Sequence, residues 1–109
     1  MNSYRKSKKP KLLDRLRSAI RTRHYSIRTE EAYTSWVKRF ILFHNKRHPR
    51  DMGEKEINQF LSYLAEEKNV ASSTQNQALC AIIFLYKHVL KIEIGDLGDL
   101  ARAKKPKRL

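Results

Sequence analysis

The sequence predicts an all-α domain built from four main helices. Apolar residues recur at spacings of three and four through most of the chain, which is the period of amphipathic helices. No segment alternates convincingly between apolar and polar residues, as a half-buried strand does. A chain of 109 residues can bury one hydrophobic core without disulfides or metal. We therefore expect a compact four-helix bundle, with room for at most a short fifth helix.

The first helix is expected over residues 11–22. The basic residues 1–10 that precede it are expected to be disordered in isolation. Three arginines lie outside its narrow apolar stripe, and the sequence leaves open whether they form a solvated face or contact phosphate. The stripe consists of Leu12, Leu13, Leu16 and Ile20, and the arginines are Arg15, Arg17 and Arg21.

The second helix is expected over residues 27–47. Ser26 is placed to cap its first turn, and Pro49 favours an end before the proline. One face is aromatic and apolar and the other is basic, so the helix can bury one side and present cations on the other. The apolar face holds Tyr33, Trp36, Val37, Phe40, Ile41 and His44, and the polar side holds Arg28, Ser35, Lys38 and Arg39.

The third helix is expected to follow Gly53 and to stop near Lys68 or Asn69. The fourth begins at Ser72, where Gln75 has the spacing of a capping box. Residues 78–86 are apolar almost all round, which predicts a central helix surrounded by the other three, with Cys80 as a buried structural thiol. After Lys91, two glycines and a proline allow at most a short turn of helix around residues 97–101.

The charge of the chain predicts a polyanionic partner. There are 24 Lys and Arg against 11 Asp and Glu, a net charge of +13, and nucleic acid is the usual partner of such an excess. Residues 5–23 hold nine basic residues and one acid, and residues 102–108 hold five basic residues and no acid. Five of the eleven acids lie between Asp51 and Glu67, so that segment is expected to point away from phosphate.

Catalytic and metal sites are not expected from these residues. The four histidines are spread over three elements without CxxC, HExxH or an Asp-rich loop, so no metal and no cofactor is expected. Cys80 has no base nearby in its helix, the paired glutamates lie on exposed surface, and the glycines form no phosphate-binding loop. Nothing resembles a signal peptide or an apolar run long enough to span a membrane, which favours a cytosolic protein. No small-molecule substrate is expected.

With catalytic and metal sites set aside, DNA binding through helix surfaces is the function that the sequence favours. Short polar side chains near a helix N-terminus can reach base edges and phosphates, and two such clusters occur, at residues 26–29 and 72–77. If both helices begin on the same side, Arg28, Lys38, Arg39 and Lys87 flank a shared surface. The alternative is that both clusters are ordinary caps on a basic protein.

Three blocks of sequence resemble integron integrases, which are tyrosine site-specific recombinases. They read HYS-x-RTE-x-AY-x-x-W from His24, FH-x-x-RHP-x-x-MG from Phe43, and V-x-x-STQNQAL from Val70. They occur in the order and spacing of that family, and the resemblance covers roughly residues 11–109. It implies a SAM-like core-binding domain over residues 11–101, which clamps one face of duplex DNA while a separate C-terminal domain holds the catalytic tyrosine. No tyrosine of this chain matches that setting, and residues 102–109 resemble the start of the linker to an absent catalytic domain.

The resemblance also implies a set of DNA contacts and partners. Other recombinase subunits are the expected partners in the full-length bacterial protein, whereas the isolated domain is expected to be a monomer. Protein–protein contact during synapse assembly, through the acidic third helix or residues 97–100, is the alternative function. The implied DNA contacts are Ser26, Arg28, Thr29, Lys38, Thr74, Gln75, Asn76, Gln77, Lys87, Lys104 and Lys105.

Overall fold

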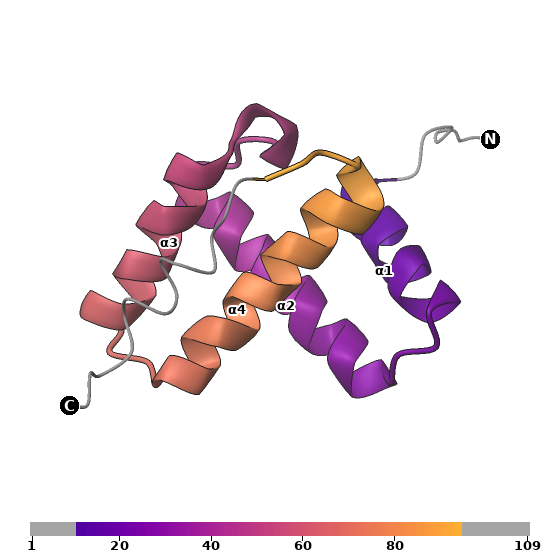
Figure 1. Ribbon diagram of the computed structural model, residues 1–109, viewed down its shortest axis with the longest axis horizontal. Coiled ribbons are helices and arrows are strands. Elements are labelled where there is room, and N and C mark those ends of the chain that lie inside the picture. Colours follow the sequence, from indigo (N-terminus) through magenta and orange to yellow (C-terminus); the bar gives the residue numbers. More distant parts are fainter. Residues whose placement is uncertain (1–10, 95–109) are drawn as a thin grey trace.

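The computed structural model describes residues 11–94, and every regular element in that range is helical, as predicted. Four α-helices follow one another, and α4 crosses α2 at a steep angle (Figure 1). The expectations for residues 1–10, 97–101 and 102–109 lie outside the described residues. The elements are α1 (Leu12–Thr22), α2 (Ile27–Phe43), the 3₁₀ turn η1 (Pro49–Asp51), α3 (Glu54–Glu66), α4 (Ser72–Phe84) and the π-helical segment η2 (Leu85–Leu90).

One hydrophobic core joins all four helices, and the expected apolar stripes supply it. Leu16 and Ile20 of α1 are fully buried, and so are Val37 and Phe40 of α2. Leu12, Leu13, Tyr33 and Ile41 are only partly buried and pack against the edge of this core. The fully or almost fully buried residues of the later helices are Ile57, Phe60, Leu61, Leu64, Ala78, Ala81, Ile82, Leu85 and Tyr86.

Helix α2 ends at Phe43, earlier than the proline predicted. Asn45 and Lys46 both adopt positive φ angles, 60° and 65°, which an α-helix cannot continue through. The N–H of Lys46 turns back to the carbonyl of Ile41. Two left-handed residues therefore terminate the helix before Pro49, and Pro49, which is buried, instead opens the turn η1.

Helix α4 differs from the prediction at its start and along one face. Its N-cap is Ala71 and no side chain caps it, so the expected capping box between Ser72 and Gln75 does not form. The helix packs on α2 and α3, but its outer face is open and Cys80 is exposed there. The expectation of a fully surrounded helix with a buried thiol is therefore wrong, because no fourth element covers that face within the described residues.

The end of the last helix is tied to the turn before α3. The hydroxyl of Tyr86 donates to the carbonyl of Pro49 at 2.6 Å and lies 3.3 Å from that of Met52. Burial raises the pKa of this phenol well above its usual value. Lys91, at φ 58°, then ends the helical segment in a left-handed conformation. The bond to Pro49 joins residues 37 positions apart, and so it ties η2 to η1.

Candidate nucleic-acid interface

Helices α2 and α4 cross, and both begin at the same edge of the molecule. In Figure 1 their N-termini lie at the lower edge, one at each side, so the condition set by the sequence for a shared surface is met. From Ser73 onwards, the exposed residues of α4 and η2 recur at spacings of three and four and form a single stripe along the outer side. They are Ser73, Asn76, Gln77, Cys80, Ile83 and Lys87.

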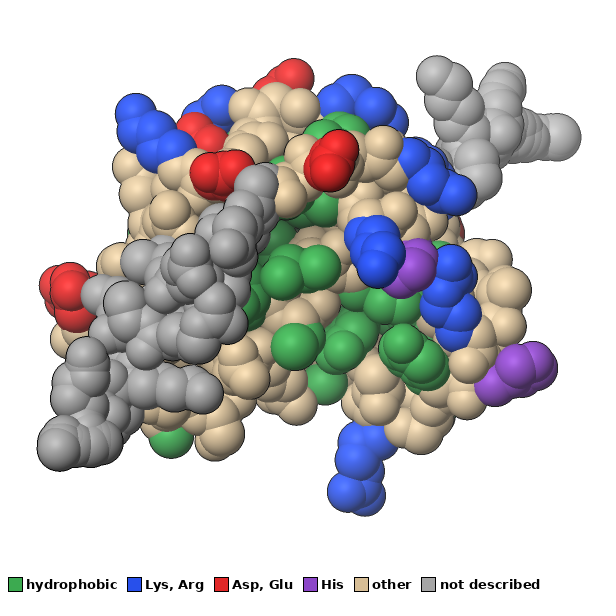
Figure 2. Space-filling view, viewed as in Figure 1, with side chains coloured by type: hydrophobic (Ala, Val, Ile, Leu, Met, Phe, Trp, Pro, Cys, Tyr) green, Lys and Arg blue, Asp and Glu red, His purple; other side chains and the backbone are tan. Residues whose placement is uncertain are grey.

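This face carries cations and polar groups around an apolar centre. Figure 2 shows hydrophobic side chains on it, with basic side chains and a histidine beside them. No acidic residue occurs between Ser72 and Lys91, and the acidic side chains in Figure 2 lie along the upper and left edges of the view. Helices η1 and α3 hold Asp51, Glu54, Glu56 and Glu66. The acidic segment thus lies mainly on α3, and its orientation away from phosphate stays a prediction.

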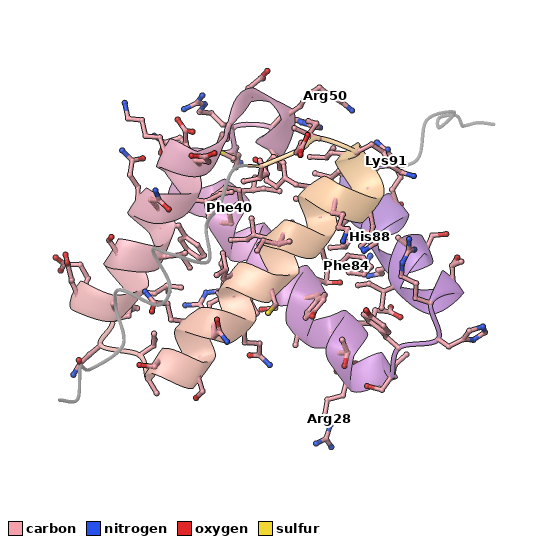
Figure 3. The ribbon with its side chains drawn as sticks, in the orientation of Figure 1. Arg28, Phe40, Arg50, Phe84, His88 and Lys91 are labelled. Atoms are coloured by element: carbon pink, nitrogen blue, oxygen red, sulfur yellow. The ribbon has the colours of Figure 1, made fainter. Side chains whose placement is uncertain are left out.

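The capped first turn of α2 places Arg28 at the molecular edge. The Oγ of Ser26 accepts the backbone N–H of Thr29 at 3.1 Å, so the predicted cap is confirmed. The Ser26 hydroxyl also donates to Oγ1 of Thr29, so both side chains are engaged in hydrogen bonds within the cap. Arg28 is exposed and extends away from the bundle (Figure 3). Of the three residues, Arg28 is the one whose side chain is held out from the fold.

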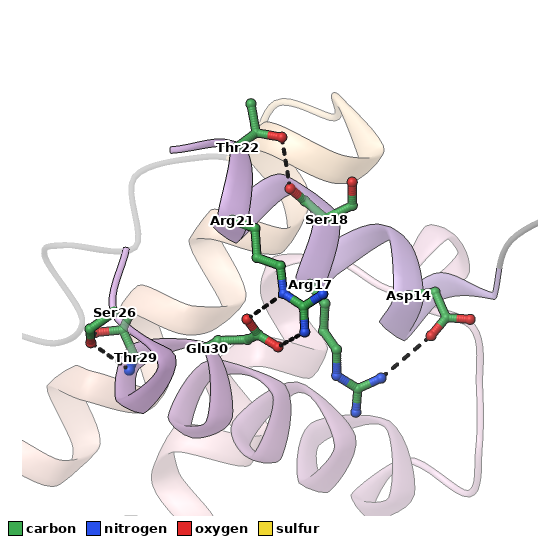
Figure 4. Close-up of polar contacts among 8 residues, drawn as sticks. All are labelled: Asp14, Arg17, Ser18, Arg21, Thr22, Ser26, Thr29 and Glu30. Carbon is green, nitrogen blue, oxygen red and sulfur yellow. Dashed lines mark hydrogen bonds and ion pairs between the residues drawn. The ribbon is translucent and has the colours of Figure 1, made fainter. Parts of the chain in front are cut away.

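An ion pair between α1 and α2 holds that turn in place. Nε and Nη2 of Arg21 each lie 2.8 Å from a carboxylate oxygen of Glu30, a bidentate arrangement (Figure 4). The Arg21 guanidinium lowers the pKa of Glu30, mainly through this hydrogen bonding, and partial burial of the carboxylate opposes the shift. Arg21 therefore forms an ion pair within the fold and, with its side chain 64% exposed, also belongs to a solvated face, one of the two roles that the sequence left open.

The other two arginines of α1 also have partners within the chain. Nη2 of Arg15 donates to the carbonyl of Val89 at 2.8 Å, and Nη1 of Arg17 lies 3.4 Å from a carboxylate oxygen of Asp14. The first contact ties α1 to η2. The second is an exposed pair one turn apart, which stabilises a protein little. Arg15 is thus part of the scaffold, whereas the side chain of Arg17 stays 41% exposed.

The polar start of α4 divides into an exposed part and a buried part. Asn76 and Gln77 are exposed, and Thr74 is half-buried. Gln75 is only 4% exposed, and its Nε2 donates to the carbonyl of Leu61 on α3 at 3.0 Å. The inclusion of Gln75 in the DNA surface is therefore corrected, because its side chain points into the bundle and holds α3 against α4.

Of the remaining predicted cations, only Lys87 lies on the outer stripe of α4 and η2; Lys38 lies on another side of α2, and two lie beyond the described residues. Lys38 is exposed on α2, on the side away from the core, and Lys87 is exposed on η2. Glu31 is exposed on the same helix surface as Lys38. Lys104 and Lys105 lie outside the described residues.

A group at the helix crossing was not in the predicted site. The indole N–H of Trp36 donates to Oε1 of Gln77 at 3.1 Å, and the guanidinium carbon of Arg39 lies 4.5 Å from the centre of a Trp36 ring. Trp36 itself is buried, whereas Arg39 and Gln77 are exposed. The helical spacing marked Trp36 as core and Arg39 as surface, but the contact across to α4 is non-local.

A second unpredicted group lies beside Lys87. Nη2 of Arg23 lies 2.8 Å from Nδ1 of His88, and the guanidinium stands 5.6 Å from the ring centre of Phe84 (labelled with His88 in Figure 3). A guanidinium can only donate, so Nδ1 of His88 is unprotonated. Burial, followed by the charges of Arg23 and Lys87, lowers the pKa of His88. A neutral His88 thus positions Arg23 at this face.

Metal-binding clusters and membrane-spanning helices do not occur in the described part of the chain. Within residues 11–94, no three His, Cys, Asp or Glu side chains come together in a way that could hold a metal ion. None of the helices in the same range combines the length and the apolar character needed to cross a membrane.

Known proteins share both the family and much of the sequence of this chain. Residues 12–96 match the family described as phage integrase, N-terminal SAM-like domain. An integrase/recombinase of Escherichia coli and one of Pseudomonas aeruginosa are each 48% identical over 99 residues, which is 91% of this chain. A putative integrase/recombinase of Sinorhizobium fredii is 28% identical over 98 residues, which is 90% of this chain.

The match is to one part of these longer relatives. The chain spans 29% of the first two and 32% of the third. The family match covers all of the helices from α1 to η2. It extends to residue 96, two positions past the last residue that the structure describes. On this match, the chain belongs to the family of phage integrase N-terminal SAM-like domains.

Proposed function

We propose that this chain is the core-binding domain of a tyrosine recombinase of the integron-integrase type, and that it clamps duplex DNA at recombination sites. The observation that carries the proposal is the face crossed by α4, where a helix without acidic residues lies over α2 and basic side chains surround an apolar centre. Relatives named integrase/recombinase support a DNA partner. The proposed contacts are Arg28, Lys38, Thr74, Asn76, Gln77 and Lys87, with Ser26 and Thr29 at the capped turn and Lys104 and Lys105 beyond the described residues.

Catalysis is assigned to a separate domain of the full-length recombinase. Two tyrosines of this chain support that assignment, because Tyr86 is buried and hydrogen-bonded to Pro49, and Tyr33 packs against Phe84. We infer that this chain contributes affinity for the DNA and orients the recombinase on it, while strand cleavage requires groups outside this chain. Other recombinase subunits on the same DNA are its proposed protein partners.

Because this domain is proposed to contact only one face of the duplex, its binding to DNA alone is expected to be weak and strongly dependent on salt. Neutralising Z phosphates gives a slope of about −0.9Z in log affinity against log salt concentration. Fluorescence anisotropy of a labelled duplex, titrated with the chain at several salt concentrations, measures this slope. A flat salt response would refute phosphate contact, and stronger binding to single-stranded RNA than to duplex DNA would refute the choice of partner.

A pair of arginine variants tests the placement of the interface. Arg28 and Arg50 are both exposed and lie at opposite edges of the molecule (Figure 3). Arg28→Ala and Arg50→Ala remove the same charge, and we expect only Arg28→Ala to weaken binding and to reduce the salt slope by about one. Equal losses from both variants would show that the attraction is a property of total charge, with no defined face.

Subunit contact is the second candidate function, and exposed apolar residues favour it. Leu42 is 53% exposed and Phe43 is 37% exposed at the end of α2. Amide chemical shifts recorded during a DNA titration separate the two candidates. DNA binding should move the signals of residues 26–39 and 72–77, and a chain that makes only protein contacts should leave them unchanged.

A further inference from the structure

The contact between Trp36 and Gln77 fixes which way the Gln77 amide points. An indole N–H can only donate a hydrogen bond, so the amide atom 3.1 Å away must be the carbonyl oxygen. The amide nitrogen of Gln77 has no hydrogen bond to another residue in the described part of the chain, and Gln77 is exposed. Two N–H donors of this amide are therefore left available at the surface.

Trp36 also holds a second donor group next to the first. The guanidinium of Arg39 stacks on the indole at 4.5 Å, and Arg39 is exposed. A guanidinium carries five N–H donors and no acceptor. The buried indole is held in turn by an edge contact with Phe60, at 6.5 Å between ring centres. One rigid side chain thus supports donors from both α2 and α4.

We propose that Trp36 is a positioning residue that makes this part of the interface donate hydrogen bonds to acceptor atoms of duplex DNA. This inference rests on the proposed function. Phosphate oxygens and the O6 and N7 atoms of guanine are acceptors of that kind. A glutamine that reads adenine uses its carbonyl oxygen to accept from the N6 amino group, but here the indole N–H already takes one of the two acceptor positions of that oxygen. The arrangement therefore disfavours adenine at this position.

The orientation of the amide can be tested without DNA. The chain contains one tryptophan, so the indole N–H gives one resonance in a ¹H–¹⁵N spectrum. Gln77→Met keeps the side-chain length and removes the acceptor, and we expect the indole signal to shift and its hydrogen exchange to accelerate. Asn76→Ala, the neighbouring exposed residue, is the control and should leave the indole signal in place. An unchanged indole signal in Gln77→Met would overturn the assignment.

The role of Trp36 in binding is tested with two labelled duplexes of equal length, one of G·C pairs and one of A·T pairs. Trp36→Phe keeps an aromatic ring but loses the N–H. We expect Trp36→Phe and Gln77→Met each to raise Kd about three- to tenfold, the loss of one hydrogen bond, and the double variant to lose no more than either. Loss on the G·C duplex alone identifies guanine as the acceptor, and equal loss on both identifies phosphate.

Three outcomes contradict the proposal. These are additive losses in the double variant, unchanged binding by folded Trp36→Phe, and a loss confined to the A·T duplex. Should Trp36→Phe fail to fold, Gln77→Met tests the same contact, because it leaves the indole in the core. A wild-type chain that binds neither duplex refutes the proposed function itself, and the indole measurement keeps that result separate from the orientation of Gln77.

Discussion

Two adjacent residues at the start of α4, Gln75 and Asn76, are expected to respond oppositely to substitution by alanine. Gln75 is 4% exposed and bonded to the carbonyl of Leu61, while Asn76 is exposed. Gln75→Ala removes a buried hydrogen bond, worth about 0.5–1.5 kcal/mol, and buried methylene area worth about 0.8 kcal/mol. We therefore expect a loss of about 1–3 kcal/mol in the free energy of unfolding. Asn76→Ala is expected to stay within about 0.5 kcal/mol of wild type.

Urea denaturation followed by circular dichroism measures both variants under the same conditions. The m-value should be unchanged, because neither substitution alters the surface exposed on unfolding by much. Duplex affinity, measured below the start of unfolding, should fall for Asn76→Ala and stay near wild type for folded Gln75→Ala. Equal stabilities would refute the structural role of Gln75. Loss of duplex affinity in a fully folded Gln75→Ala chain would show that Gln75 contributes to DNA binding.

Two other predictions concern the scaffold that holds the interface. Tyr86→Phe leaves the carbonyl of Pro49 without its 2.6 Å donor and should cost about 1–3 kcal/mol in urea denaturation, and an unchanged midpoint would contradict this. Arg21 lowers the pKa of Glu30, so the folded state binds this proton more weakly than the unfolded state. The stability from the pair should be present above the usual pKa of glutamate and be lost as pH falls through the folded value. Glu30→Gln should flatten the stability–pH curve there, and a curve that keeps its slope would contradict the assignment.

Local chemistry explains why most of the fold could be predicted. The stripes of α1, α2 and α3 repeat at helical spacing, so their burial follows from the chain itself once a core forms. Ser26 needed only its own turn to cap α2, and the structure confirms it. The end of α2 was placed too late, since the left-handed residues Asn45 and Lys46 leave a weaker sequence signal than Pro49 does.

The exposure of the candidate site residues was predicted well where they lie on helix surfaces and poorly where packing across helices decides. Arg28, Lys38, Asn76, Gln77 and Lys87 are all exposed, as their positions indicated. Sequence neighbours alone could not separate Gln75 from Asn76, because both are amides one residue apart. The separation depends on which one faces α3.

The sequence by itself determined an all-α domain with a strongly basic composition and a separate acidic helix, because helical period and charge are properties of neighbouring residues. Only the tertiary structure decided which polar side chains are free to bind. Arg21 and Arg15 of α1 are bonded to Glu30 and Val89, and Trp36 orients Gln77 from another helix. Contacts between residues far apart in the chain depend on the crossing of the helices, and no local pattern encodes that crossing.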